Sequence, residues 1–545
     1  MSAAGDDAGD ARVRRPANAE GADRAPATVT LSRRAAVALL VAPLAAPALV
    51  GLTRKAPPAI AGGFVDDGGA VGHRLRDGAE PPATRRTVRT PVVIVGAGIA
   101  GLSAGWWLRR HGLDDFTVLE LERQAGGNAR WGENDVSRFP WGAHYIPVPG
   151  PEATLVRTLL EELGVWTDGA WDERHLVHAP RERLLMHGEW HPDVEPALAL
   201  PQWERDELQR FHDRMGELRA TGAFAVPTWS VGEAPLRRTA QLDRESMSAW
   251  LDREGFRSPA LRWYVDYACR DDYGALARDT SAWAGIHYFA SRPPGEEGPL
   301  TWPEGNGFVV RALLERLGPR VVTGTPAHRV ERTAGGVRVL AGDTAYVAEQ
   351  VILAVPEFVA TRLLGAPPPA RPRVHSPWLT ANLVLRRPPR ERRGAEPSWD
   401  NVIYDSPSLG YVIANHQSLA THAGRAVWTF YHALADLSPS EGRRLLLRRS
   451  WTEWVDWILA DLARAHPDIR ECVERVDVMR LGHAMVRPTP GFLAARASPA
   501  RRAAGDRWGG RVIRAHSDAS GLSLFEEAQW QGVEAARIVL GARTT

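Results

Sequence analysis

The sequence has very little lysine and very little cysteine. Lys55 is the only lysine among 545 residues, although lysine and arginine together number 67. Chemistry that needs a lysine in the body of the fold is therefore excluded. The only cysteines, Cys269 and Cys472, form no C-x-x-C pair, so the sequence supports neither a zinc site nor a dithiol redox centre. A single disulfide between them stays possible.

The sequence also has no large excess of charge of either sign. The net charge is +2, which gives no reason to expect a nucleic-acid partner. Hydrophobic residues at 44% and charged residues at 24% are typical of a soluble globular protein. Because 545 residues exceed what one hydrophobic core normally holds, we expect two closely joined domains.

The first 61 residues have the composition of a disordered lead followed by an export signal. Residues 1–30 show no apolar periodicity. Ser32, Arg33 and Arg34 then precede an apolar stretch at 35–52, which resembles a twin-arginine signal for export, with a periplasmic destination. The alternative is an uncleaved membrane anchor formed by residues 35–52. We expect no other membrane contact.

A glycine-rich turn at Gly96, Gly98 and Gly101 separates the apolar run 92–95 from a helix-like stretch. In a strand–turn–helix unit of this kind, the first glycine permits the turn, the second lets the backbone approach a pyrophosphate, and the third allows close packing. Free N–H groups at the helix start, at Ile99 and Ala100, would attract the anion.

A second apolar run, residues 116–119, ends on Glu120, which is followed by Leu121. A carboxylate at this distance from the glycines can accept hydrogen bonds from a ribose diol, and it disfavours the 2′-phosphate of NADP. A turn that serves tight packing alone is the competing interpretation. Strand, turn, helix and acid agree in favouring a dinucleotide site.

The next segments resemble the flavin-dependent amine oxidase superfamily, which includes monoamine and polyamine oxidases, spermidine dehydrogenase and phytoene desaturases. The resemblance rests on a G-G-x-x-R segment and on the turn W-G-A-H, and it implies FAD as the cofactor. It places Gly126, Gly127 and Arg130 at the pyrophosphate, and Gly142, Ala143 and His144 beside the flavin ring.

The resemblance returns in two later blocks. Residues 302–356 contain a W-P-E-G-N-G segment and strand-like runs, and the resemblance implies that Val330 touches adenine. Near the C-terminus a short strand ends at Asp518, which would bind the ribityl chain or pyrophosphate. A closing helix from Leu524 would point its N-terminus at the flavin.

Together these segments predict an α/β fold: a Rossmann-type FAD-binding domain of glutathione-reductase-like topology, interleaved with an α+β substrate domain. The expected boundaries, in order, are 1–61 for the lead and signal, 62–150, 300–360 and 476–545 for the FAD-binding domain, and 151–299 and 361–475 for the substrate domain.

Four residues are candidates for catalysis. His144 and His483 lie in segments that the resemblance places near the flavin, and histidine titrates near neutral pH. Asp272 and Tyr273 belong to a group of acids and aromatics that could line a pocket for a cation. The histidines lack the spacing of metal ligands, so we expect no metal.

These features predict an FAD-dependent oxidoreductase, a dehydrogenase or an oxidase. It would take a hydride from a small organic substrate, possibly an amine, onto flavin N5. The lysine that amine oxidases commonly hold near N5 has no counterpart here, which favours an electron acceptor, still unknown, other than oxygen. Two alternatives stay open: a flavin-dependent isomerase or mutase without net redox chemistry, and a noncatalytic flavin-binding assembly protein.

Overall fold

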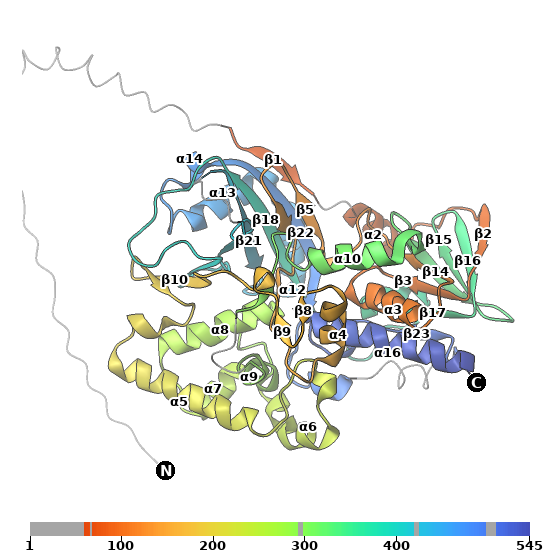
Figure 1. Ribbon diagram of the computed structural model, residues 1–545, viewed down its shortest axis with the longest axis horizontal. Helices are drawn as coiled ribbons and strands as arrows, with labels where there is room; N and C mark the ends of the chain where they lie inside the picture. The colour runs from red at the N-terminus through yellow and green to blue at the C-terminus, as the bar shows by residue number, and fades with distance from the viewer. Residues whose placement is uncertain (1–58, 66–67, 293–297, 419–423, 497–507, 545) are drawn as a thin grey trace, which may run out of the picture. The chain divides into compact units, whose positions relative to one another are not determined.

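The computed structural model describes residues 59–65, 68–292, 298–418, 424–496 and 508–544 (Figure 1). The expected export signal, with its arginine pair and the apolar stretch 35–52, lies outside these residues. Among the helices that are described, none is long and apolar enough to cross a membrane.

A five-stranded parallel sheet brings together strands from three separated parts of the sequence. Its order is β13 (Val321–Val322), β4 (Phe116–Leu119), β3 (Val92–Val95), β17 (Gln350–Leu353) and β23 (Val512–Arg514). All four residues of β3 are buried, as expected for a central parallel strand that is covered on both faces.

Helices cover one face of this sheet, and a second sheet packs against the other. Helices α3 (Ile99–Arg110), α10 (Gly307–Leu317) and α16 (Phe525–Thr544) pack together over one face, joined by α4 (Thr154–Glu162). The opposite face packs on a four-stranded sheet of β14 (Ala327–Arg332), β15 (Val337–Ala341), β16 (Thr344–Ala348) and β2 (Arg86–Arg89). The fold class predicted from the sequence, a Rossmann-type α/β domain, is confirmed.

A larger, mostly antiparallel sheet forms the other half of the molecule (Figure 1). Its eight strands are, in order, β1 (Ala61–Phe64), β22 (Val473–Val486), β18 (His375–Leu385), β21 (Ala426–Ala433), β20 (Tyr411–Ile413), β19 (Asp400–Ile403), β10 (Glu182–Met186) and β11 (Glu189–Pro192). All eleven residues of β18 are buried, because this strand lies between two helical layers.

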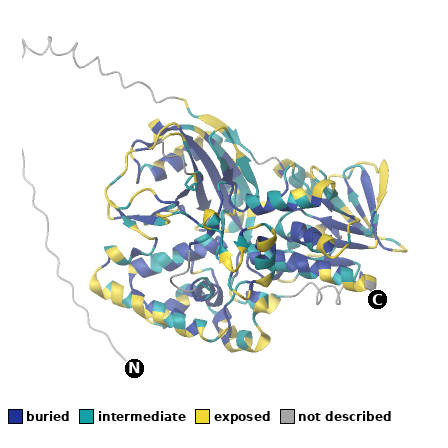
Figure 2. Cartoon of the chain, in the orientation of Figure 1, coloured by how far each residue is buried: buried dark blue, intermediate teal, exposed yellow. Residues whose placement is uncertain are grey.

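One helical layer consists of α12 (Pro439–Arg448) and α13 (Trp451–Leu462). The other is a helical group of α5 (Gln202–Arg219), α6 (Glu233–Thr239), α7 (Met247–Arg253), α8 (Pro259–Tyr273) and α9 (Ala282–Ala290). In Figure 2 the exposed faces of these outer helices contrast with the buried central strands.

Two stretches whose amphipathic pattern predicts one helix each, 246–263 and 438–465, are each divided between two helices. The stretch 438–465 contains α12 and α13, separated by Arg449 in an extended conformation. Ser450 then starts α13 with a capping box to Glu453. Similarly, the stretch 246–263 divides between α7 and α8, where Ser258 caps the new helix and Pro259 occupies its first position.

Strand β22 continues through residue 476, where the sequence suggested that the third FAD-binding segment begins. It pairs with β18 along most of its length and with β1 on its other side. Residues 476–486 thus belong to the eight-stranded sheet, and only the chain beyond them returns to the parallel sheet.

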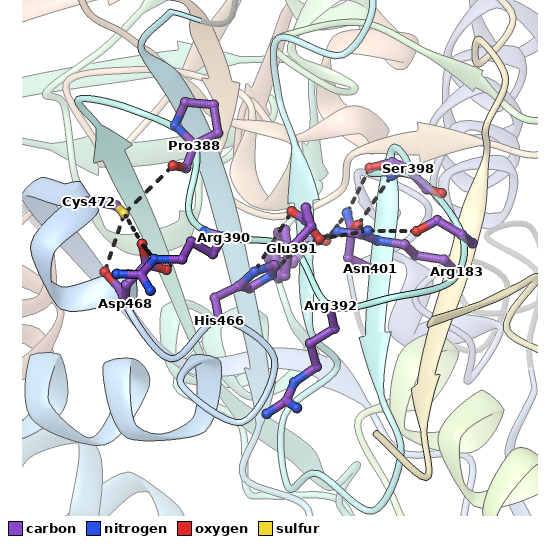
Figure 3. A network of polar contacts seen from close by, with 12 residues as sticks. Arg183, Pro388, Arg390, Glu391, Arg392, Ser398, Asn401, His466, Asp468 and Cys472 are labelled. Carbon is purple, nitrogen blue, oxygen red and sulfur yellow. Dashed lines mark hydrogen bonds and ion pairs between the residues drawn. The ribbon is translucent and has the colours of Figure 1, made fainter. Parts of the chain in front are cut away.

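A buried polar network fixes the junction of β10 and β19 (Figure 3). Arg183 is fully buried, donates hydrogen bonds to Asn401 and Glu391, and stacks on Trp190 at 3.9 Å. Arg183 and Asn401 are register partners in the parallel pair. Because side chains alternate along a strand, the preceding partners, Glu182 and Asp400, point to the opposite face.

Candidate active site

The turn between β3 and α3 requires glycine at two of its positions. Gly96 has a φ of +100°, and a Cβ there would lie 2.4 Å from the Ala354 carbonyl oxygen. A Cβ on Gly101 would lie 1.8 Å from the Gly96 oxygen. No side chain caps α3, so its first N–H groups stay available to an anion.

This turn opens into a cavity of about 1580 Å³ that runs from the parallel sheet to the eight-stranded sheet. Most residues predicted to bind the cofactor line it. They are Gly96, Gly98, Ile99, Ala100, Glu120, Leu121, Gly126, Gly127, Ala143, Val330, Asp518 and Leu524, together with the catalytic candidate His483.

Four predicted cofactor residues do not line the cavity. Gly101 supports the turn from behind it, and Gly142 and His144 lie beside the lining residue Ala143. Arg130 turns away, because its Nε donates to the Gly127 carbonyl and its guanidinium lies 3.6 Å from Glu122. Half-buried there, it supports the loop that carries Gly127.

Glu120 is placed as the ribose site requires. It lies at the end of β4, and its carboxylate accepts hydrogen bonds from the N–H groups of Ala97, at 2.7 Å, and Glu122, at 3.0 Å. Burial nevertheless raises the pKa of Glu120, because these two bonds offset only part of the desolvation. A hydroxyl donor on the cavity side would favour the ionised form.

Asp518 lies at the opposite wall of the cavity and is held by three partners. His375 Nε2 lies 3.0 Å from its carboxylate, His516 lies 3.2 Å away, and the N–H of Glu357 donates to it at 2.8 Å. Burial by itself would raise the pKa of Asp518. The neighbouring histidines outweigh burial and hold this pKa well below its usual range.

Two buried polar atoms of the lining residues have no partner in the protein. They are Oδ1 of Asn306 and Nδ1 of His328. His328 Nε2 accepts from Gly342 N–H, which leaves Nδ1 as a donor facing the cavity wall near Val330. With the glycine turn, the uncapped helix and Glu120, these atoms fit a dinucleotide such as FAD, which would satisfy them.

Beyond Ala143, His144 enters an aromatic group. Its ring stacks on Tyr431 at 4.6 Å and lies 5.5 Å from Trp399, and Tyr145 lies across Trp399 at 6.0 Å. Burial lowers the pKa of His144 to about 4. At neutral pH this side chain is therefore uncharged. It can donate or accept a hydrogen bond but cannot supply a positive charge.

Carboxylates face this aromatic group from two directions. The Tyr145 hydroxyl donates to Asp271 at 3.3 Å. Glu182 and Asp400 come from the opposite side, as register partners on β10 and β19. Among the described residues, no arginine or histidine forms an ion pair with any of these three carboxylates.

Burial and neighbouring negative charges raise the pKa of all three acids. Burial, followed by the charges of Asp193 and Asp271, raises the pKa of Glu182 to about 7. Burial and the charge of Asp272 raise the pKa of Asp271 to about 7, and burial with the charge of Glu182 raises that of Asp400 well above its usual value. All three side chains are only half-buried. They form an acidic cluster of like charges, and a cation bound to it would lower the pKa of each carboxyl.

The two neighbouring catalytic candidates have structural partners. Asp272 forms an ion pair with Arg292 at 2.8 Å, and only 5% of its side chain is exposed. The Tyr273 hydroxyl donates to the Ala284 carbonyl at 2.8 Å and is fully buried. Asp271, one residue earlier on α8, is the member of this segment that contacts the aromatic group, through Tyr145.

Sequence reasoning missed Glu182 and Asp400. No motif surrounds either residue, and they are brought together only by the parallel pairing of strands that lie far apart in the chain. In the described part of the chain, no group of three or more histidines, cysteines or acids could hold a metal ion. Cys269 and Cys472 are both buried and unbridged.

Comparisons with known proteins agree with this geometry. A family model described as an NAD(P)-binding Rossmann-like domain matches residues 94–163. A flavin-containing amine oxidase of Oncorhynchus mykiss is 24% identical over 293 residues, which cover 51% of this chain and 53% of the relative. The chain thus matches about half the length of this curated relative.

Solved structures share the fold at low sequence identity. Putrescine oxidase bound to putrescine matches with a TM-score of 0.61 at 21% identity, covering 84% of this chain and 100% of that one. A fatty acid isomerase from P. acnes matches with a TM-score of 0.55 at 16% identity, covering 83% and 98%. One fold therefore serves both oxidases and an isomerase, and the reaction must be argued from the site. This chain therefore shares its fold with putrescine oxidase and is similar in sequence, over about half its length, to flavin-containing amine oxidases.

Proposed function

We propose that the protein is an FAD-dependent oxidoreductase whose substrate is a small organic cation, an amine. The carrying observation is the acidic cluster of Glu182, Asp271 and Asp400 beside the aromatic group around His144. Three half-buried carboxylates with raised pKa values favour a cationic ligand, and aromatic faces add cation–π attraction.

The two sites adjoin at one turn of the chain. Ala143 lines the dinucleotide cavity, and the next two residues, His144 and Tyr145, belong to the aromatic group. Bound FAD would supply a two-electron acceptor for hydride transfer. A substrate between the carboxylates and the turn would then lie beside the cofactor.

The protein's own residues would bind, orient and protect the substrate. The carboxylates would hold the ammonium group, and the rings of Tyr431 and Trp399 would exclude water around it. His144, neutral at pH 7, could accept a proton from a substrate N–H group but would not repel the cation. Asp272 and Arg292 would hold α8 in position through their ion pair.

The similarity to amine oxidases supports the same conclusion. Putrescine oxidase is named for an amine substrate and shares the fold. No feature of the pocket favours the isomerase or the noncatalytic assembly protein over this function. An electron acceptor other than oxygen and export from the cytoplasm remain part of the proposal.

The proposal is tested with the purified protein and a panel of substrates that share one carbon skeleton. The cofactor is first released from one portion of the protein and identified. Initial rates of the cofactor-loaded protein are then compared for primary amines, the matching alcohols and the matching carboxylates, with a dye as electron acceptor. We expect FAD and oxidation of the amines alone. A protein that takes up no FAD, or that prefers the alcohol or the carboxylate, would contradict the proposal.

A further inference from the structure

The cavity extends past the dinucleotide elements into a region that the proposed function does not use. We call this region the basic vestibule and define it by His73, Phe358, Val374, Arg443, Leu447 and His483, all of which line the cavity. Its walls are α2 (Gly69–Arg76), α11 (Glu357–Leu363), α12 and the end of β22. Most of these elements lie outside the Rossmann unit.

The vestibule exposes large apolar side chains. Phe358 is 43% exposed, Val374 40% and Leu447 56%, and they are three of only six large hydrophobic side chains that are exposed among the described residues. Helix α2 buries none of its residues, although Gly72, His73 and Leu75 line the cavity. Apolar groups gathered on one concave surface indicate a ligand with an apolar part.

The vestibule also gathers positive charge without matching acids. Arg443 makes one long hydrogen bond, 3.4 Å to the His375 carbonyl, and forms no ion pair with any described carboxylate. Burial lowers its pKa. His483 makes ring contacts with Phe358 and His375, and burial followed by the charges of Arg443, His375 and His73 lowers its pKa to about 4.

The nearest carboxylates are already engaged. Asp518 is held by His375 and His516, and Glu441 closes the capping box of α12 with Ser438. The other carboxylates of the lining are Glu120, which belongs to the dinucleotide part, and Glu80, which lies on the segment that follows α2. A guanidinium that loses water without gaining an anion is costly, and an anionic ligand would offset that cost.

Size gives an independent reason for a second ligand. The cavity volume of 1580 Å³ exceeds the roughly 300–1000 Å³ of an ordinary ligand pocket. The glycine turn, Glu120 and Asp518 mark the part that a dinucleotide would fill. The vestibule reaches beyond them to α12, which packs on β18 and β22 of the other sheet.

We propose that the basic vestibule binds a small organic anion, with a carboxylate or phosphate group on an apolar body, while FAD occupies the dinucleotide part of the cavity. The anionic group would bind Arg443, and the apolar body would contact Phe358 and Leu447. The proposal requires that the protein bind FAD, but it does not depend on the substrate being an amine.

The test is calorimetric titration of the FAD-loaded protein with four probes. Phenyl phosphate and benzoate carry both features, inorganic phosphate carries charge alone, and benzyl alcohol carries the ring alone. We expect the first two, or one of them, to bind more tightly than the last two. Comparing the first two identifies whether the vestibule prefers phosphate or carboxylate.

Variants on α12 locate the binding site. Arg443→Gln should weaken binding about tenfold or more, the size expected for one charge-assisted hydrogen bond. Arg448→Gln is the matched control, because it removes the same charge from an exposed position on the same helix that does not line the cavity. Leu447→Asn should weaken phenyl phosphate or benzoate and leave inorganic phosphate unchanged, and it decides the matter if Arg443→Gln does not fold.

Four results would overturn the proposal. They are no binding of either aromatic anion, binding of neither aromatic anion more tightly than inorganic phosphate and benzyl alcohol, equal losses in the Arg443 and Arg448 variants, and binding only to protein stripped of FAD. The last result would mean that the vestibule is part of the FAD site. Failure of amine oxidation, by contrast, would leave each of these titrations unchanged.

Discussion

Replacing Glu182 with glutamine should separate substrate binding from stability. Glu182 lies next to Asp400 in the β10–β19 register, and burial with the charges of Asp193 and Asp271 raises its pKa more than the charge of Arg181 lowers it. In the proposed complex its carboxylate holds the ammonium group. Glutamine has nearly the same shape and can still accept a hydrogen bond, so the change mainly removes the charge.

The expected loss of substrate affinity follows from the lost charge. A hydrogen bond to a charged group contributes about 1.5–3 kcal/mol, which corresponds to an affinity about 10- to 150-fold weaker. We expect kcat/KM for an amine to fall by this amount above pH 7. Because the pKa of Glu182 is about 7, the wild-type carboxyl is increasingly protonated at lower pH, and the loss should be smaller at pH 6.

Glu182→Gln should increase the stability of the protein at pH 8, although it weakens substrate binding. The pKa of Glu182 rises from 4.5 to about 7 in the folded protein. Because the folded protein binds this proton more tightly than the unfolded chain, the protonated carboxyl contributes its full stability below pH 4.5. This contribution is lost as the pH rises through 7 and the carboxyl ionises. At about 1.4 kcal/mol for each pKa unit, and with allowance for partial exposure, the ionised group costs the wild-type about 1–3 kcal/mol at pH 8. Glu182→Gln should recover this.

The assays are steady-state kinetics with a dye acceptor and urea unfolding at pH 5 and pH 8. Asp193→Asn is the matched control, because Asp193 is an exposed carboxylate near Glu182 whose φ of +74° asparagine tolerates. It should change kcat/KM little. The reasoning is refuted if Glu182→Gln keeps its amine kinetics, if it lowers stability at pH 8, or if Asp193→Asn loses as much activity.

Three further substitutions test separate parts of the account. Gly101→Ala should abolish FAD binding or destabilise the fold, because its Cβ would clash with the Gly96 oxygen. Gly72→Ala should be tolerated, because its Cβ would meet no atom within 4 Å. FAD content and thermal unfolding of both variants check this prediction. Tyr273→Phe should cost about 1 kcal/mol of stability through one lost hydrogen bond and leave kcat unchanged, so a large fall in kcat with unchanged stability would restore the catalytic role predicted from the sequence. Arg292→Met should destabilise the protein by about 3–5 kcal/mol, because it leaves Asp272 buried without its partner, and an unchanged denaturation midpoint would count against this ion pair.

The sequence predicts the dinucleotide turn well because its constraints are local. Gly96 and Gly101 serve contacts within one strand–turn–helix unit, and Glu120 ends the next strand. Asp518 could be placed only through the family resemblance. Its partner His375 gives no sequence signal, because His375 lies 143 residues away.

The acidic cluster of Glu182, Asp271 and Asp400 illustrates what sequence patterns leave out. Asp271, Asp272 and Tyr273 are consecutive, and only the pitch of α8 decides which of them belongs to the cluster. Glu182 and Asp400 meet through a parallel strand pair, which local patterning does not specify. Helix breaks at Arg449 and Ser258 were similarly hidden, because the apolar periodicity continues across the caps.

The central claim is that one chain holds FAD and an amine cation side by side. The most direct measurement is an anaerobic titration of the purified, FAD-loaded protein with a primary amine, followed by flavin absorbance. The account predicts bleaching of the oxidised flavin, with an apparent affinity that weakens in Glu182→Gln. An oxidised spectrum that persists at saturating concentrations of every amine tested would contradict it.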